Sequence, residues 1–298
     1  MNCCRVQISD SDINSADDGI CLKSDPSTTG RGCEDITITN CRLRTSANGL
    51  KLGTASHHKF RRIRAYDLDV RDPFRAAVVL ESVDGAVIDD VIISRVRARY
   101  TGSALFLRLG QRSPNRPPGQ LRNVLLSDFD VQVPSGKPDR DYEHEGPPPK
   151  LRSNLLPAAL VGLPDPPLEN VTLRNFTITY GGGGQGTHAE TPLAKLAALS
   201  DERDEYPEFS MFGELPAWGF FVRNGRNIRF ENVTLHREQP DFRSAFVADN
   251  IDGVTLDHVS FMSGSEEPVV VLSRVQNENL RGLTWPTKTT GLRLHRQP

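Results

Sequence analysis

The chain has 298 residues, of which 37% are hydrophobic and 25% are charged, and its formal net charge is -2. These fractions are close to globular averages and exclude a disordered or collagen-like polymer. With 36 Lys and Arg against 38 Asp and Glu, the chain lacks the basic excess of nucleic-acid-binding domains. No apolar run approaches the roughly 18 residues of a membrane-spanning helix. We therefore expect neither nucleic acid nor a membrane as a partner.

Glycine and proline contribute 24 and 21 residues, which is typical of a turn-rich chain rather than a helical one. All five cysteines lie between Cys3 and Cys41, and an odd, clustered set predicts no disulfide framework. Met1 is followed by neither a positively charged region nor an apolar segment, so the sequence shows no recognisable secretory signal.

An internal repeat runs through the whole chain. In each copy aliphatic and polar residues alternate, the alternation breaks near an Asn or Asp, and it then resumes. Equivalent positions such as Val6, Ile36 and Ile63 recur with a period of roughly 28 residues. Such a period with two-residue alternation and no helical stripe indicates a solenoid of strands. The copies lie at residues 4–13, 34–43, 60–70, 90–96, 121–131, 169–178, 226–235 and 252–261.

The leucine-rich repeat signature is missing from these copies. The sequence therefore predicts an all-β chain, a right-handed parallel β-helix of about nine to ten coils, forming one domain over residues 1–298.

A second family of short strands alternates with the first, and its copies lie at residues 19–24, 49–54, 77–82, 104–109 and 219–224. Stacked strands sit ~4.8 Å apart and alternate side chains face in and out. We expect an inward column of aliphatic side chains and two outward columns beside it. The inward column is Ile20, Leu50, Val78 and Leu105, and the outward ones are Cys21, Lys51, Val79 and Phe106, and Lys23, Gly53, Glu81 and Arg108.

Two segments interrupt the repeat. Residues 134–167 contain nine prolines, which predicts a loop. Residues 181–218 begin with four glycines and carry a charged run at 201–208, and a short helix is expected near 193–199. Long insertions in solenoids fall on loops and often build the binding face.

Two adjacent carboxylates, Asp17 and Asp18, precede the first short strand. Hydrolysis of a glycosidic bond needs one acid to protonate the leaving oxygen and a second carboxylate to activate water. Close like charges also help to keep one member of such a pair protonated. Taken alone, the stretch is more typical of a solvated Asp-Asp-Gly turn than of a catalytic pair.

Residues 15–24 read Ser-Ala-Asp-Asp-Gly-Ile-Cys-Leu-Lys-Ser, which resembles the Gly-Asp-Asp-Cys-Ile-Ala-Ile-Lys-Ser motif of the family 28 glycoside hydrolases, the polygalacturonase family. Residues 30–38 resemble the family segment that follows, and residues 104–110 and 211–223 resemble its bacterial branch. The resemblance implies an inverting hydrolase of α-linked sugars in pectin-like polysaccharide. Asp17 would be the general acid and Asp18 part of the general base, with no cofactor and an extracellular or periplasmic location.

The chain departs from that family in its binding residues. The family's upstream Asn-Thr-Asp motif would precede Cys3 and is not in this chain, which we interpret as an N-terminal truncation. Its Gly-His-Gly matches residues 47–49, where Asn48 replaces the histidine, and its Arg-Ile-Lys matches residues 79–81, where both cations are replaced. Those cations hold the galacturonate carboxylate in the family, so uronate specificity does not carry over with the motif.

Other residues could contact a sugar at this site. We name Asn48, Lys51 and Arg108 as candidate substrate-binding residues, and we add His57 and His58, which follow the second short strand. No His, Cys or carboxylate cluster has a recognisable ligand spacing, so we predict no metal site. The expected protein is a monomer that binds a polysaccharide or oligosaccharide.

Two alternatives to hydrolysis remain open. A polysaccharide lyase on the same architecture would need Ca²⁺-binding carboxylates and an Arg or Lys base. A non-catalytic β-helix would bind glycans without cleaving them, since a fold never fixes a function.

Overall fold

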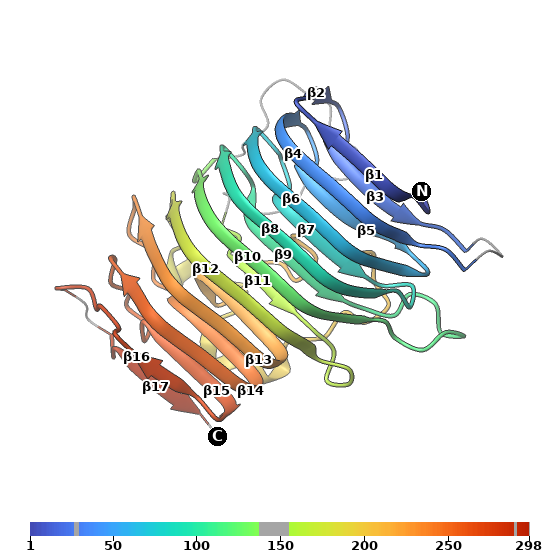
Figure 1. The fold of residues 1–298 in the computed structure, drawn as a ribbon. Coiled ribbons are helices and arrows are strands. Elements are labelled where there is room, and N and C mark those ends of the chain that lie inside the picture. Colours follow the sequence, from blue (N-terminus) through green and yellow to red (C-terminus); the bar gives the residue numbers. More distant parts are fainter. Residues whose placement is uncertain (27–29, 137–154, 289–290, 298) are drawn as a thin grey trace.

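The computed structural model describes residues 1–26, 30–136, 155–288 and 291–297. Strands account for 58% of the structure and helices for 3%. The strands stack in chain order into a sheet that winds on itself (Figure 1), and every pairing recorded among the described strands is parallel. This architecture is a parallel β-helix, and it confirms the predicted fold class.

Each coil contains a short strand, a turn, a long strand and a loop that leads to the next short strand. The separate short strands are β3 (Ile20–Ser24), β5 (Leu50–Ser56), β7 (Ala76–Ser82), β9 (Ser103–Leu109), β11 (Ala158–Val161), β15 (Val270–Gln276) and β17 (Leu294–Gln297). The long strands are β4 (Cys33–Thr45), β6 (Lys59–Arg71), β8 (Val87–Arg99), β10 (Gln120–Val133) and β12 (Leu168–Tyr180).

In the C-terminal half the two strand types merge. Both β13 (Ala217–Arg237) and β14 (Ser244–Phe261) contain a short and a long segment, while β1 (Cys4–Ser9) and β2 (Asp12–Ser15) form the first long segment and β16 (Asn279–Arg281) lies in the last coil. Among the described residues nine short segments stack on one another. This count agrees with the nine to ten coils that the repeat length predicts.

The core is the stack of inward side chains. Ile20 lies opposite Leu50, Leu50 opposite Val78, and Val78 opposite Leu105. None of these side chains is more than 6% exposed. Each coil alone could not bury an apolar face, so neighbouring coils stabilise one another through these columns.

The long strands β4, β6, β8, β10 and β12 each bend at two positions, where φ lies between +51° and +60°. Asn and Asp adopt this left-handed conformation more readily than other non-glycine residues, which is why the alternation in the sequence breaks there. The side chains at the bends also bond along the helix axis. Asn175 Nδ2 donates to Asp128 Oδ1 at 2.8 Å, and Asn232 Nδ2 donates to Asn175 Oδ1 at 2.9 Å.

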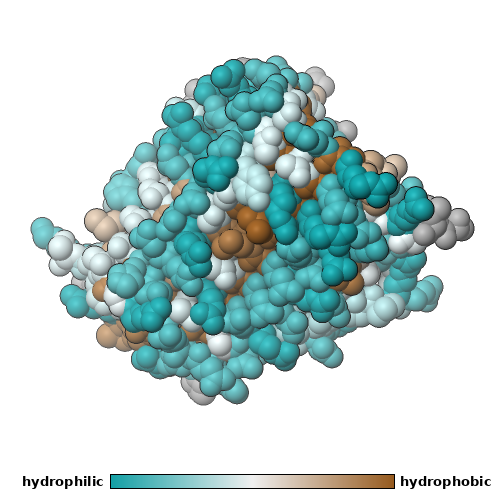
Figure 2. Space-filling model, in the orientation of Figure 1, coloured by the Kyte–Doolittle hydropathy of each residue, from teal (hydrophilic) through white to brown (hydrophobic). Residues whose placement is uncertain are grey.

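The surface formed by the long strands is mostly hydrophilic, with a small apolar strip near its centre (Figure 2). Many of its charges pair between adjacent coils, as Arg95 does with Asp67 at 2.6 Å and Arg99 does with Asp130. In the described part of the chain no helix has the length and apolar character needed to span a membrane. The five cysteines are free thiols.

The first predicted insertion contains a strand that the sequence analysis missed. The sequence predicts a loop over residues 134–167, of which residues 137–154 lie outside the described residues. The prediction was wrong at β11, which is a strand inside this range. This strand has only four residues and adds one rung between β9 and β13. Its short apolar run, Ala158–Val161, was hidden by the prolines on both sides.

The second insertion occupies residues 181–216, between β12 and β13. It contains two 3-10 helices, η1 (Gly186–His188) and η2 (Leu193–Ala198), so the expected short helix is present in 3-10 form. Its apolar side chains pack on the outward face of the short strands and form a second core. That core includes Val79, Phe106, Ala159, Phe221, Val247 and Val271 from the strands, and Leu193, Leu196, Phe209, Phe212 and Leu215 from the insertion.

We predict that Asn175→Ala lowers the free energy of unfolding by about 1–2 kcal/mol, because alanine pays the cost of the left-handed conformation that the bend requires. Asn175→Gly should cost less, since glycine adopts positive φ without strain. Urea denaturation of the three proteins checks this. Equal stability of the alanine and glycine variants would show that backbone strain at the bend is unimportant.

Candidate functional site

The loop that carries Asp17 and Asp18 joins β2 to β3 and stacks on the equivalent loop of the next coil. Gly19 N donates to Asn48 O at 2.8 Å. The backbone N and the Nδ2 of Asn48 both donate to Asp18 Oδ1, at 3.1 and 2.7 Å, and Thr45 Oγ1 donates to Asp17 O. The loop is therefore fixed through its backbone and one carboxylate, while both carboxylates remain half-buried rather than enclosed.

These carboxylates lie in a cavity of about 860 Å³. Its other walls come from the first three coils and from the second insertion, which is far away in the sequence. The lining is rich in carboxylates and contains three aromatic rings. It consists of Asp17, Asp18, Lys23, Lys51, Thr54, Phe74, Arg75, Glu202, Glu205, Tyr206, Glu208, Phe209, Ser210 and Met211.

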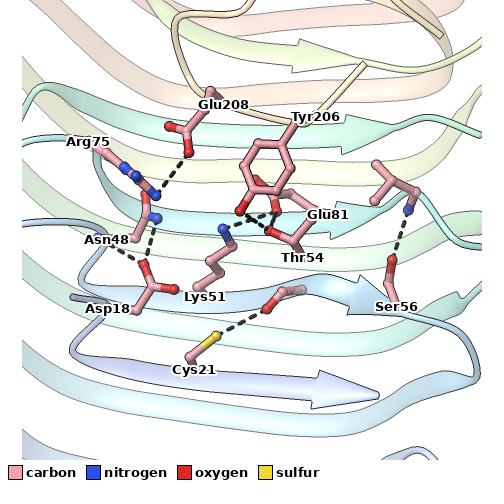
Figure 3. A network of polar contacts seen from close by, with 12 residues as sticks. Asp18, Cys21, Asn48, Lys51, Thr54, Ser56, Arg75, Glu81, Tyr206 and Glu208 are labelled. Carbon is pink, nitrogen blue, oxygen red and sulfur yellow. Dashed lines mark hydrogen bonds and ion pairs between the residues drawn. The ribbon is translucent and has the colours of Figure 1, made fainter. Parts of the chain in front are cut away.

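Figure 3 shows how the insertion meets the coils at this cavity. Arg75 Nη1 lies 2.9 Å from Glu208 Oε1, and Thr54 Oγ1 lies 3.2 Å from the hydroxyl of Tyr206. Neither Arg75 nor Glu208 was among the residues expected from the sequence. The stacking of equivalent positions could have identified Arg75, because it follows Asp17 and Ala47 in successive coils.

Lys51 belongs to this network, but not as a free cation. Its Nζ lies 3.3 Å from Glu81 Oε2, and the two side chains are 3% and 2% exposed. Burial opposes the charge of Lys51, but the carboxylates of Glu81 and Asp18 outweigh it and raise the pKa of Lys51. Burial raises the pKa of Glu81 to about 7, although Lys51 acts in the opposite direction. Lys51 lines the cavity, but its charge is already paired with Glu81, so its substrate-binding role stays a prediction.

Arg108 is not part of the cavity lining, and its expected contact with substrate needs correction. Its side chain is buried under the insertion, where Nη2 donates to the carbonyl oxygens of Asp201 at 2.6 Å and Glu202 at 2.8 Å. Its guanidinium lies 5.3 Å from the ring centre of Phe212. Burial lowers the pKa of Arg108 to about 10. Arg108 anchors the segment that closes the cavity.

His57 and His58 lie beyond the cavity lining as well. The carbonyl oxygen of His57 accepts from Arg116 Nη1 at 2.9 Å, and its Nε2 lies 3.8 Å from Asp84 Oδ2. Burial lowers the pKa of His57, although Asp84 acts in the opposite direction. The backbone of His58 donates to Ser24 Oγ at 2.9 Å. The structure thus brings together the loop carboxylates, Asn48 and Lys51, and it leaves the two histidines apart.

The thiol of Cys21 lies close to Asp18, in surroundings that disfavour its thiolate. Its Sγ donates to Gly53 O at 3.0 Å. Burial and the nearby Asp18 raise the pKa of Cys21 to about 12, so the reactive thiolate is scarce at neutral pH. Within the described residues no group of three or more His, Cys, Asp or Glu side chains is arranged to hold a metal ion.

A second hollow, of about 1190 Å³, lies among the loops after β12, β13 and β14. Its lining includes the glycine-rich residues 183–186 and two carboxylates, Asp241 and Glu266, of which Asp241 is buried in structural contacts. Arg243 Nη2 lies 2.8 Å from Asp241 Oδ2, both side chains are at most 1% exposed, and Gly184 N donates to the same oxygen at 2.9 Å. This hollow is larger, but the candidate chemistry belongs to the cavity around Asp17 and Asp18.

Comparison of the chain with protein-family models, with curated proteins and with solved structures finds no match. The resemblance to the family 28 glycoside hydrolases therefore stays a hypothesis that rests on the Asp17-Asp18 motif and the repeat.

We predict that Lys51→Met lowers the free energy of unfolding by about 3 kcal/mol at pH 8, because it leaves the buried Glu81 without its partner. The loss should be smaller at pH 5. Burial already raises the pKa of Glu81 from its ordinary value of 4.5 to about 7, and removing the cation raises it further. The folded state then binds more protons than the unfolded state, so stability falls as pH rises through this window.

Urea denaturation at pH 5 and pH 8 measures this effect. The matched control is Lys59→Met, since Lys59 pairs with Glu34 at 2.7 Å but is 45% exposed. An exposed pair should contribute less than about 1 kcal/mol. A loss for Lys51→Met that is the same at both pH values would argue against an ionised Glu81.

We predict that Arg108→Met releases the segment around residues 201–206, because two charge-assisted hydrogen bonds to its backbone are lost. Each such bond contributes about 1.5–3 kcal/mol. Proteolysis within this segment should therefore accelerate by about tenfold or more, since cleavage follows the population of the open form. Arg95→Met, which removes an exposed ion pair on the long-strand surface, serves as the control. Unchanged cleavage in Arg108→Met would show that other contacts hold the segment.

Proposed function

We propose that this protein is a glycoside hydrolase that cleaves α-linked sugars of pectin-like polysaccharide with inversion of configuration. The observation that carries the proposal is the position of Asp17 and Asp18. They are adjacent, half-buried and fixed by the neighbouring coil, and they line a cavity large enough for sugar residues. Phe74, Tyr206 and Phe209 add aromatic surface to that cavity, and apolar faces next to a few oriented polar groups are typical of small-molecule sites.

The reaction needs two carboxyl groups in different protonation states. One gives its proton to the glycosidic oxygen as the bond from that oxygen to the anomeric carbon breaks. A water molecule attacks the same carbon from the opposite face, and its proton passes to the second group, a carboxylate. The family resemblance assigns the first role to Asp17 and the second to Asp18. The two hydrogen bonds from Asn48 both reach Oδ1 of Asp18 and orient its carboxylate.

Charge at the site favours a neutral sugar over a uronate. Five carboxylates line the cavity against three cations, and two of those cations are held by Glu81 and Glu208. A substrate carboxylate would meet like charges and compete for cations that already have partners. Lys23, at the edge of the cavity, is the cation to which the structure gives no ion pair among the described residues.

We predict that Asp17→Asn and Asp18→Asn each reduce hydrolysis by about 10²–10⁴-fold, which is the usual contribution of a positioned acid or base. The measurement is release of reducing sugar from a panel of neutral and acidic α-linked pectic oligosaccharides. Circular dichroism and thermal unfolding show whether the variants keep the β-helix. Wild-type rates in both variants would reject this site, and binding of the oligosaccharides without cleavage would favour a non-catalytic protein.

A lyase is separated from a hydrolase by its product. A lyase generates an unsaturated sugar that absorbs in the ultraviolet and loses activity when a chelator removes Ca²⁺, whereas the proposed hydrolase generates a saturated reducing end. The anomeric form of the first product, followed by NMR, reports whether configuration is inverted.

A further inference from the structure

Glu208 is a carboxyl group of the insertion that contacts the network around Asp17 and Asp18 through Arg75. It lines the same cavity, and its side chain is 26% exposed. It comes from the inserted segment and not from a repeat position, so no copy of it occurs in the other coils. Figure 3 shows its carboxylate directed toward Arg75, with Asn48 between this pair and Asp18.

Glu208 meets the coils at a different level from Asp17 and Asp18. Its partner Arg75 stands two coils beyond Asp17 at the equivalent position, and two steps of ~4.8 Å give roughly 10 Å between backbones. Asp17 and Asp18 are consecutive residues of one loop, whereas Glu208 lines the same cavity from the insertion.

The surroundings of Glu208 make its carboxyl group easier to protonate than an exposed glutamate. Burial is the main cause, and it raises the pKa of Glu208 above its ordinary value. Asp18 and Asp17 on the facing loop add to the effect, while Arg75 and Lys51 oppose it. The other titratable groups nearby are Glu202, Glu205 and Tyr206 on its own segment and Glu81 behind Lys51. A carboxyl group that holds its proton more tightly than usual, opposite other carboxylates, has the character of a general acid.

We propose that Glu208 is a third catalytic carboxyl group, which protonates the glycosidic oxygen while Asp17 and Asp18 act on the attacking water. This inference rests on the proposed function and reassigns one of its roles. The proton of Glu208 goes to the leaving oxygen as its bond to the anomeric carbon breaks. The water molecule forms the new bond to the anomeric carbon and gives its proton to the carboxylates of Asp17 and Asp18. The products are two sugars, and solvent returns the proton to Glu208.

The insertion acts as a positioning element in this reaction. Arg75 holds the carboxyl group at 2.9 Å, and the aromatic ring of Phe209, the next residue, is 7% exposed in the second core. Arg108 fixes the backbone of the same segment at Glu202. Glu208 therefore stands on a segment that is packed and bonded, as a catalytic group requires.

The test compares two kinds of substrate that differ in their need for an acid. The first kind is the panel of neutral and acidic α-linked pectic oligosaccharides, whose leaving group must be protonated. The second is the set of corresponding α-glycosyl fluorides, whose leaving group departs as fluoride with little assistance. Loss of a general acid slows the first kind and spares the second, while loss of the base slows both.

For Glu208→Gln we expect hydrolysis of the oligosaccharides to fall by about 10²–10⁴-fold and hydrolysis of the fluorides to change by less than about threefold. The fall of wild-type kcat/KM on the alkaline side should disappear from the pH profile, because the group that titrates there is gone. Asp17→Asn should be slow on both kinds of substrate. Asp204→Asn, an exposed position of the same segment outside the cavity lining, should behave like the wild type, with all variants checked for folding by thermal unfolding.

Three results would overturn the inference. Near-wild-type rates of Glu208→Gln on both kinds of substrate would show that Glu208 takes no part in the reaction. Equal losses of rate on both kinds would show that Glu208 binds the substrate or assists the general base. Selective loss on the oligosaccharides in Asp17→Asn instead would return the acid role to Asp17. In each of these cases the proposed hydrolase stands. If the wild type cleaves neither kind of substrate, the proposed function fails and the inference fails with it.

Discussion

The structure depends on the register between neighbouring coils, in which each strand residue pairs with its equivalent in the next coil. Because each coil repeats about every 28 residues and neighbouring strands lie ~4.8 Å apart, every residue stacks on its equivalent in the next coil. Inward positions such as Ile20, Leu50 and Val78 therefore build a continuous apolar core. Bend positions must accept a left-handed backbone, and their Asn and Asp side chains bond along the axis. A single register thus sets the core, the bends and the position of the loops.

The same register creates the candidate site. The loops that lead into β3, β5 and β7 lie above one another, so Asp18 meets Asn48 and Arg75 follows Asp17 along the axis. Charged side chains that stack this closely destabilise the fold unless each has a partner of opposite charge. The free-energy cost of an unpaired charge is larger at a buried position than at the surface. Lys51 is accordingly paired with Glu81, whose carboxylate lies 3.3 Å from its Nζ.

The insertion over residues 181–216 converts an open sheet face into an enclosed one. Strand side chains such as Val79 and Phe106 point outward, and without a cover they would be an exposed apolar patch. Phe209 and Phe212 of the insertion pack on that face, and Arg108 bonds its backbone. Covering this face brings the segment with Glu208 to the edge of the carboxylate cavity, so one packing event both stabilises the fold and completes the cavity.

Pattern along the chain was enough to predict the β-helix, most strand positions and the stacking columns, because two-residue alternation and a constant period are local properties that neighbouring coils repeat. It also identified Asp17 and Asp18, whose place before a strand follows from the same pattern. Spacing could not show that Lys51 is neutralised, that Arg108 anchors a loop or that Glu208 enters the cavity. Those facts depend on where a segment without a repeat pattern folds back onto the first coils, and packing between parts of the chain far apart in the sequence sets that position.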